Sequence, residues 1–154
     1  MSLKVALACD HAGFGLRPQV LTQLADLGVE VLDLGACEYD AKDDYPDIGK
    51  RIATAIACKE ADRGIMLCGT GVGAVIVANK FKGVYACLCH DPYTAAQGVI
   101  NNDMNLLCIG SLTIGKAILG QVVQAYVTAQ WGEIPRHAKR LEMIHELEDQ
   151  NFAL

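Results

Sequence analysis

Residues 67–73 of this 154-residue chain read Leu-Cys-Gly-Thr-Gly-Val-Gly, a glycine-rich segment that starts on a cysteine. Gly69, Gly71 and Gly73 permit a close backbone approach, and they leave N–H groups free to bind an anion or an oxyanion formed during a reaction. A phosphate site has no need of a thiol, whereas removing a proton from carbon needs a base. The segment therefore predicts an oxyanion hole beside Cys68; the simpler alternative is a tight strand-to-helix turn without a ligand.

Cys68 stands at the mouth of these amides, and their partial positive charge is expected to favour the thiolate that a base or nucleophile requires. We expect the Thr70 hydroxyl to hydrogen-bond the thiol or the substrate. The other six cysteines are interpreted as reduced and structural, because the total is odd and the spacing forms no disulfide framework. Cys87, Cys89 and His90 lack a second ligand pair with zinc-like spacing, so no metal is predicted.

Nucleotide binding is the competing interpretation of the same glycines. Gly69-x-Gly71-x-x-Ala74 fits a permissive dinucleotide fingerprint, and Asp91 follows about 20 residues later, where a ribose-binding acid is found. The fingerprint belongs after the first strand of such a fold, and here it follows the third predicted strand. A nucleotide-binding module is therefore kept as the alternative from a different class.

Arg136 and Arg140 form an i,i+4 pair if a helix begins after Pro135. Like charges at this spacing repel, and cations near a helix N-terminus oppose its dipole. An anion between the two guanidiniums relieves both effects, and two forked donors suit a phosphate group. The pair predicts phosphate binding, with a solvated charged face as the alternative.

Short β-rich runs alternate with runs of helical periodicity along the whole chain, which predicts βαβ crossovers and a mostly parallel sheet covered on both faces. The predicted strands lie near 4–9, 29–33, 64–68, 84–89 and 105–109. The predicted helices lie near 15–27, 46–60, 73–80, 92–100, 114–130 and 138–149. No repeat or linker interrupts the pattern, so residues 1–154 are expected to form a single domain.

Ligands of such sheets bind beyond the carboxyl ends of the strands. Asp10 and His11 follow the first predicted strand, residues 68–73 follow the third, and His90 follows the fourth. Tyr45 opens the helix after the second strand, with the following proline at a favourable first-turn position. These side chains are therefore expected to converge on one site.

The overall composition excludes several classes of partner. The net charge of −5 gives no general reason to bind nucleic acid or an anionic membrane. The apolar opening reaches Asp10 too early for a signal peptide, and the apolar tract over 106–131 contains Lys116, so it is interpreted as a buried helix and not a membrane span. A cytoplasmic location is expected.

Seven short motifs occur in order along the chain and together resemble the sugar-phosphate isomerase family of ribose-5-phosphate isomerase B and the galactose-6-phosphate isomerase subunits. The motifs are CDHAG (9–13), DYP (44–46), CGTGVG (68–73), ANK (78–80), NDMN (102–105), IGS (109–111) and RHAKR (136–140). The resemblance implies a Rossmann-like α/β/α sandwich with a five-stranded mostly parallel sheet and a C-terminal helix. It also implies a homodimer or homotetramer with sites at the subunit interface, and no metal or cofactor. The implied reaction interconverts aldose and ketose phosphates through a cis-enediol(ate).

The resemblance assigns roles residue by residue. Cys68 matches the catalytic base and Thr70 its neighbouring hydroxyl, while a subset of the family uses a glutamate where Ala74 stands here. The expected substrate-binding positions are Asp10, His11, Tyr45, Gly69, Gly71, Val72 and Gly73, the phosphate ligands Arg136 and Arg140, and Asn102 from the neighbouring subunit.

Two departures from the family pattern bear on the substrate. Pentose-specific members carry a ring-opening histidine where Asn101 stands here, and an arginine where Leu112 stands. An amide does not exchange a proton near neutral pH. These changes favour a substrate that needs no ring opening, such as a tetrulose phosphate interconverting with erythrose 4-phosphate. The alternatives are a pentose or hexose phosphate with His90 or His11 as the acid, and a subunit that needs a different partner chain to supply one.

Overall fold

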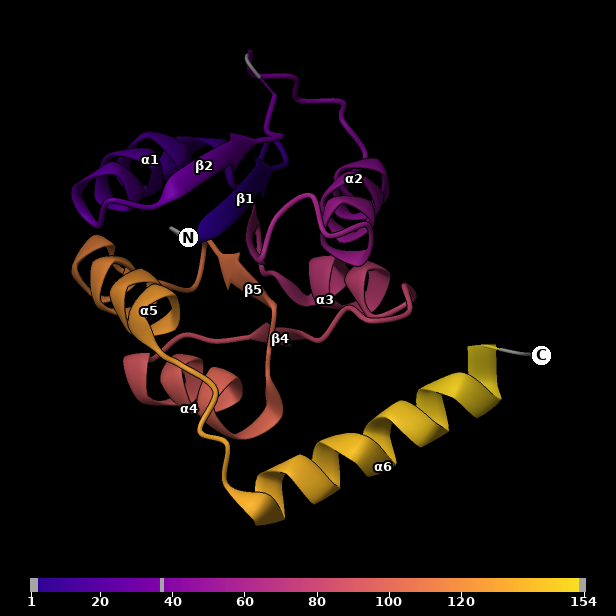
Figure 1. Ribbon diagram of the computed structural model, residues 1–154. Coiled ribbons are helices and arrows are strands. Elements are labelled where there is room, and N and C mark those ends of the chain that lie inside the picture. The colour runs from indigo at the N-terminus through magenta and orange to yellow at the C-terminus, as the bar shows by residue number, and fades with distance from the viewer. Residues whose placement is uncertain (1–2, 37, 153–154) are drawn as a thin grey trace.

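Five parallel strands form one sheet at the centre of the molecule, in a computed structural model that describes residues 3–36 and 38–152 (Figure 1). The strands are β1 (Lys4–Cys9), β2 (Glu30–Asp33), β3 (Arg63–Cys68), β4 (Ala86–Leu88) and β5 (Leu106–Gly110). Their order across the sheet is β2-β1-β3-β5-β4, and every neighbouring pair is parallel. The predicted α/β class with a parallel sheet is confirmed.

The three central strands are apolar along nearly their whole length because both faces of the sheet are covered. Val5 and Leu7 of β1 pack into a core on one face, whereas Ala6 and Ala8 pack into a second core on the other. Successive side chains of a strand point to opposite faces, so a strand buried on both sides shows no polar alternation. Cys68 belongs to the second core, at the carboxyl end of β3.

The helices cover the two faces of this sheet. They are α1 (Arg17–Asp26), α2 (Tyr45–Ala57), α3 (Val72–Ala78), α4 (Pro92–Asn102), α5 (Lys116–Thr128) and α6 (Pro135–Phe152), with a 3₁₀ turn, η1 (Phe14–Leu16), ahead of α1. The core on the β1 face that holds Val5 draws its side chains from α1, α4 and α5, and the opposite core draws them from α2 and α3. The result is the three-layer α/β/α arrangement that the sequence predicts.

Several predicted boundaries are corrected by the structure. The predicted helix over 15–27 is divided into η1 and α1, and the last helix begins three residues earlier, at Pro135. Proline suits the first turn because it has no N–H to leave unpaired. The fourth strand is shorter than the predicted 84–89, since the Tyr85 N–H donates to the Asn105 side chain, 2.8 Å away, before the ladder begins.

The last helix, α6, differs from the others in having no buried residue. It contacts α4, and the Glu148 carboxylate accepts hydrogen bonds from the Gly83 N–H at 2.8 Å and the Tyr85 hydroxyl at 3.1 Å. Met143, Ile144 and other apolar side chains of α6 stay exposed. Among the described residues, no helix has both the length and the hydrophobicity that crossing a bilayer requires.

The turn after β1 passes so close to β3 that only glycine fits at position 13. A Cβ on Gly13 would lie 2.3 Å from the Leu67 carbonyl carbon and oxygen, whereas a Cβ on Gly15 would meet nothing within 4 Å. We expect Gly13→Ala to lower the free energy of unfolding by about 3 kcal/mol through overpacking. Gly15→Ala is the matched control and is expected to change it by less than about 1 kcal/mol. Urea unfolding measures both; equal midpoints for the two variants would contradict this packing.

Candidate active site

The loops that follow β1, β3 and β5 are joined by backbone hydrogen bonds at one edge of the sheet. The Asp10 N–H donates to the Leu67 carbonyl at 3.1 Å, and the Ser111 N–H donates to the Cys68 carbonyl at 2.8 Å. The Leu112 N–H continues this pattern onto the Gly69 carbonyl at 3.0 Å. These bonds turn the carbonyls of the glycine segment toward the β5 loop, so its N–H groups face the other way.

The glycine segment is held open by close contacts that side chains would prevent. Gly71 has a φ of +79°, in the left-handed region, and it precedes α3 directly. A Cβ on Gly73 would lie 2.6 Å from the Cε2 atom of Tyr45, whose ring therefore packs against the segment. Because α3 has only seven residues, the N–H groups of the loop itself carry most of the partial positive charge that this segment offers to a ligand.

Cys68 lies close to these amides and to a carboxylate. The residue is 7% exposed, and its sulfur has the N–H groups of Gly69 and Gly71 and the Asp10 carboxylate as polar neighbours. Burial raises the pKa of the Cys68 thiol, the Asp10 carboxylate raises it further, and the two amides only partly oppose this. The loop amides act in the expected direction, toward the thiolate, but burial and the Asp10 carboxylate outweigh them, so the pKa of the Cys68 thiol is raised on balance.

Thr70 and Val72 complete the segment on its solvent side. The Thr70 hydroxyl accepts a hydrogen bond from the Val72 N–H at 3.4 Å, and both side chains are exposed. The sequence predicts that the Thr70 hydroxyl hydrogen-bonds the thiol or the substrate. In this structure the hydroxyl instead accepts a hydrogen bond from the backbone of the adjacent turn.

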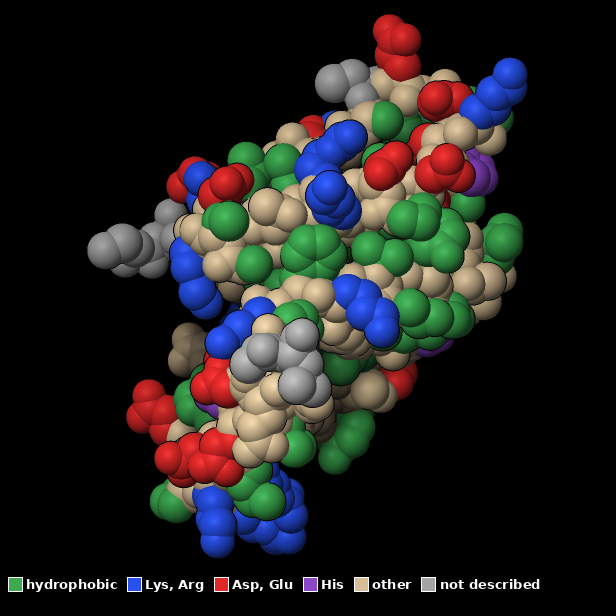
Figure 2. Space-filling model, turned by 90° about the vertical axis from the view of Figure 1, so that its right-hand side faces the viewer, with side chains coloured by type: hydrophobic (Ala, Val, Ile, Leu, Met, Phe, Trp, Pro, Cys, Tyr) green, Lys and Arg blue, Asp and Glu red, His purple; other side chains and the backbone are tan. Residues whose placement is uncertain are grey.

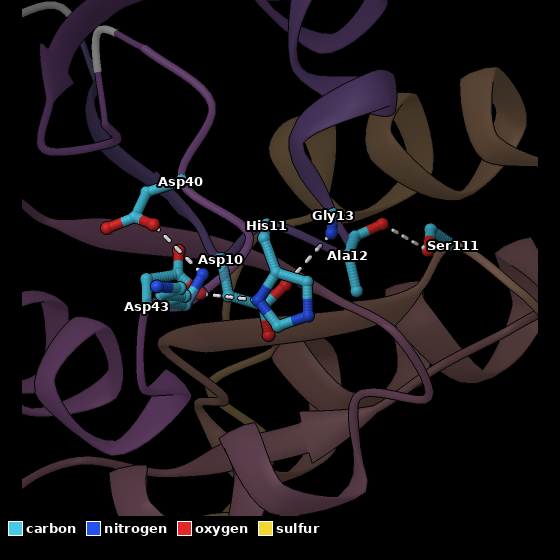
Figure 3. A network of polar contacts seen from close by, with 8 residues as sticks. Asp10, His11, Ala12, Gly13, Asp40, Asp43 and Ser111 are labelled. Carbon is cyan, nitrogen blue, oxygen red and sulfur yellow. Dashed lines mark hydrogen bonds and ion pairs between the residues drawn. The ribbon is translucent and has the colours of Figure 1, made fainter.

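Asp10 is the buried charged residue of the described chain, with 3% of its surface exposed. Figure 3 shows its carboxylate accepting from the Gly13 N–H at 2.9 Å, while the Ser111 hydroxyl donates to the Ala12 carbonyl at 2.6 Å. Two hydrogen bonds therefore hold the loop that carries Asp10 in place. The Asp10 side chain both caps this turn and lies beside Cys68.

His11 follows Asp10 and pairs with a residue that sequence reasoning did not single out. Its Nδ1 atom lies 2.5 Å from a carboxylate oxygen of Asp43, in the loop before α2 (Figure 3). The hydrogen bond that the ring donates to the Asp43 carboxylate is the main reason that the pKa of His11 is raised, ahead of a smaller opposing effect of desolvation. Asp43 is one of several acidic residues between 40 and 47, and nothing local marks it out.

The remaining predicted residues lie elsewhere on the chain. Arg136 and Arg140 are exposed on α6, which Figure 1 shows well apart from the carboxyl end of β1, and Asn102 is exposed at the end of α4. Asn101 donates to the Gln97 side chain at 2.9 Å within α4. Leu112, in contrast, lies beside Gly69 with 79% of its surface exposed. A single chain thus assembles the thiol, the carboxylate and the amides without the two arginines.

The residues after β4 have structural partners. Asp91 is the N-cap of α4 and accepts from the Thr94 N–H at 2.7 Å, which accounts for the acid that the nucleotide interpretation uses. His90 Nε2 lies 2.8 Å from the Thr113 hydroxyl. Cys87 is exposed whereas Cys89 is buried. Across residues 3–36 and 38–152, no three His, Cys, Asp or Glu side chains are grouped to hold a metal ion.

Comparisons with known proteins agree on one family. The family model described as Ribose/Galactose Isomerase matches residues 5–144. The chain is 41% identical over 147 residues to ribose-5-phosphate isomerase B of Escherichia coli strain K12, which covers 96% of this chain and 97% of the relative. The structure of the type B ribose 5-phosphate isomerase of Trypanosoma cruzi aligns with a TM-score of 0.93 at 33% identity, covering 98% of this chain and 99% of that one. Ribose-5-phosphate isomerase B of Mycoplasma genitalium, solved with bound ribulose-5-phosphate, aligns with a TM-score of 0.90 at 34% identity, covering 97% and 98%.

Proposed function

This chain belongs to the ribose/galactose isomerase family of aldose–ketose isomerases, and we propose that Cys68 is the base that moves a proton between two neighbouring carbons of a small sugar phosphate. The observation that carries this proposal is the position of the Cys68 sulfur at the carboxyl end of β3, close to the amides of Gly69 and Gly71 and to the carboxylate of Asp10. A base and an oxyanion hole directed at the same point are what proton abstraction beside a carbonyl requires.

The proposed reaction breaks one C–H bond and forms another. Cys68, once deprotonated, takes the proton from the carbon beside the carbonyl, and negative charge develops on the carbonyl oxygen. The segment from Gly69 to Gly73 supplies amide donors to that oxygen in the resulting cis-enediolate. The S–H formed at Cys68 then returns the proton to the adjacent carbon, while the hydroxyl proton moves between the two oxygens. The Cys68 thiolate is thus regenerated, and the substrate has lost one proton and gained one, so the reaction needs no cofactor.

A second copy of the chain is proposed to complete the site. The phosphate-binding pair Arg136 and Arg140 lies on α6, apart from the Cys68 loop of its own chain. Figure 2 shows basic side chains gathered where α6 begins, and Met143, Ile144 and Leu147 on the same helix are 54%, 40% and 58% exposed. Apolar side chains in such a row indicate a surface that another subunit covers. A homodimer, or a homotetramer built from it, brings α6 of one subunit to the loop of the next.

The proposed substrate is a four-carbon sugar phosphate, erythrose 4-phosphate or its tetrulose isomer. Asn101 stands where pentose-specific members of the family carry a histidine, the acid that opens the sugar ring. The Asn101 amide donates a hydrogen bond to the Gln97 side chain within α4. A tetrose whose terminal hydroxyl is esterified cannot close a furanose ring, so it needs no such acid. Leu112, exposed beside Gly69, also removes one positive charge from the phosphate region.

Ribose 5-phosphate is the second candidate, and the names of the similar proteins favour it. A five-carbon substrate requires an acid for ring opening, and the structure offers two histidines near the strand ends. His90 Nε2 faces the Thr113 hydroxyl, whereas His11 uses Nδ1 for Asp43. A third possibility is that another subunit type supplies the acid, in which case the pure chain is inert toward every sugar phosphate.

A screen of tetrose, pentose and hexose phosphates decides between these substrates. We expect kcat/KM for erythrose 4-phosphate to exceed that for ribose 5-phosphate by about 100-fold or more, because a positioned acid contributes on the order of 10²- to 10⁴-fold. Asn101→His is expected to raise kcat/KM for ribose 5-phosphate by about tenfold and to leave erythrose 4-phosphate nearly unchanged. Asn151→His, on exposed α6, is the matched control. Ribose 5-phosphate proving the best substrate of the unaltered chain by a wide margin would reject the four-carbon proposal.

A further inference from the structure

The loop before α2 places one carboxylate against the active-site loop from a distant part of the sequence. Asp43 lies 32 residues after His11, and its side chain is 13% exposed although its neighbours Asp40 and Asp44 are exposed. Its oxygen and the Nδ1 atom of His11 are 2.5 Å apart. Asp43 is therefore held in a defined contact and does not belong to the solvated acidic surface around it.

This contact determines both the charge and the direction of the His11 ring. The carboxylate accepts a hydrogen bond from the Nδ1–H group, so Nε2, on the far side of the ring, is the nitrogen that is left to bind a ligand. The acidic groups that face the ring are Asp43 and Asp40 from the loop before α2, and Asp10 from the end of β1. All three favour the imidazolium. His11 also adjoins Asp10 in the chain, and Asp10 faces the Cys68 sulfur.

We propose that Asp43 is a positioning residue: it holds His11 as an imidazolium whose Nε2–H binds the anionic group of the substrate beside the Cys68 loop. The proposal rests on the proposed function, in which the ligand carries a phosphate. Charge-assisted donors bind such anions more tightly than neutral ones. With Leu112 in place of an arginine, a histidine kept charged by Asp43 supplies positive charge that the β5 loop does not.

Asp43→Asn separates this role from a merely structural one through its pH dependence. The pKa of His11 is raised in the native chain and is expected to fall toward the ordinary 6.5 in the variant, which retains the shape of the side chain. Below both pKa values the ring is charged in both proteins; between them it is charged only in the native one. Sulfate, which does not titrate in this range, is expected to bind the variant roughly tenfold more weakly at a pH between the two His11 pKa values that the NMR titration measures, and equally at a pH below both.

The experiment follows the His11 ring by NMR during a pH titration and a sulfate titration, with resonances assigned from His11→Gln. Asp47→Asn is the matched control, since it removes the same charge from the first turn of α2 without touching His11. In a His11→Gln background, Asp43→Asn is expected to have no further effect on sulfate binding. An unchanged His11 pKa in Asp43→Asn, or equal loss of sulfate affinity at both pH values, would overturn the proposal. Neither measurement involves turnover, so a chain inert toward sugar phosphates would reject the proposed function separately.

Discussion

Cys68→Ser is expected to lower kcat by about 10³-fold or more and to abolish substrate-dependent deuterium exchange at the carbon beside the carbonyl. The two side chains have nearly the same shape, and Cys68 is packed in the second core, so the fold is expected to survive. A serine hydroxyl, however, does not lose its proton near neutral pH and cannot replace a thiolate as a base. The loss therefore reports on the chemistry and not on packing.

The raised pKa of the Cys68 thiol gives this prediction a pH dependence. Because the thiol is the favoured form in the free chain, the fraction of active thiolate is small at neutral pH and grows as pH rises toward the thiol pKa. We expect kcat/KM of the native chain to increase with pH over this range and to fall when the pH is lowered. Asp10→Asn removes the negative charge facing the sulfur, so the rise is expected at lower pH in that variant.

Exchange of solvent deuterium into the sugar phosphate, followed by NMR, measures the proton transfer directly. Cys58→Ser is the matched control, since Cys58 is exposed at the end of α2 and has no place in the site. The control is expected to retain the native rate. Retention of exchange within tenfold of the native rate in Cys68→Ser would assign the base to another group.

The fold could be predicted from the sequence because its signals are local. Val5 through Cys9 form a continuous apolar run, which is what a strand covered on both faces produces, and Pro46 marks the start of α2 by its chemistry alone. The short β4 could not be predicted in the same way. Its first ladder position is lost to the Asn105 side chain, a contact across 20 residues that leaves no trace in the periodicity of 84–89.

The residues of the site differ in the same way: those defined by neighbouring residues could be predicted, whereas those defined by contacts between distant residues could not. The glycine segment was predicted because turns with a left-handed residue such as Gly71 are encoded by neighbouring residues. The raised pKa of the Cys68 thiol could not be predicted, since burial and the Asp10 carboxylate, which outweigh the amides, come from the packing of β1 against β3. Asp43 was missed for a related reason. An acidic run does not show which of its members reaches back to His11, and only the path of the loop before α2 decides it.

Replacing both Arg136 and Arg140 with alanine is expected to raise KM by about 100-fold with little change in kcat. Two charge-assisted contacts to a phosphate are together worth on the order of 3 kcal/mol, and they act equally on substrate and transition state. Lys139→Ala, which removes the same kind of charge from exposed α6, is the control and is expected to leave KM nearly unchanged. Arg140→Lys keeps the charge but loses the fork, so an intermediate KM is expected.

The location of the two arginines allows a sharper test of where they act. If α6 serves the loop of the partner subunit, a mixed dimer of one Cys68→Ser chain and one chain lacking both arginines contains one intact site, because each chain supplies what the other lacks. Co-expression in equal amounts is then expected to restore about a quarter of the native activity at subsaturating substrate, since half of the dimers are mixed and each has one working site of two. If the arginines instead served the Cys68 loop of their own chain, every site in the mixture would carry a defect and no activity would return. Purified mixed dimers, separated by different affinity tags, distinguish these outcomes without relying on the mixing ratio, and they test the thiol, the guanidiniums and the shared interface in one measurement.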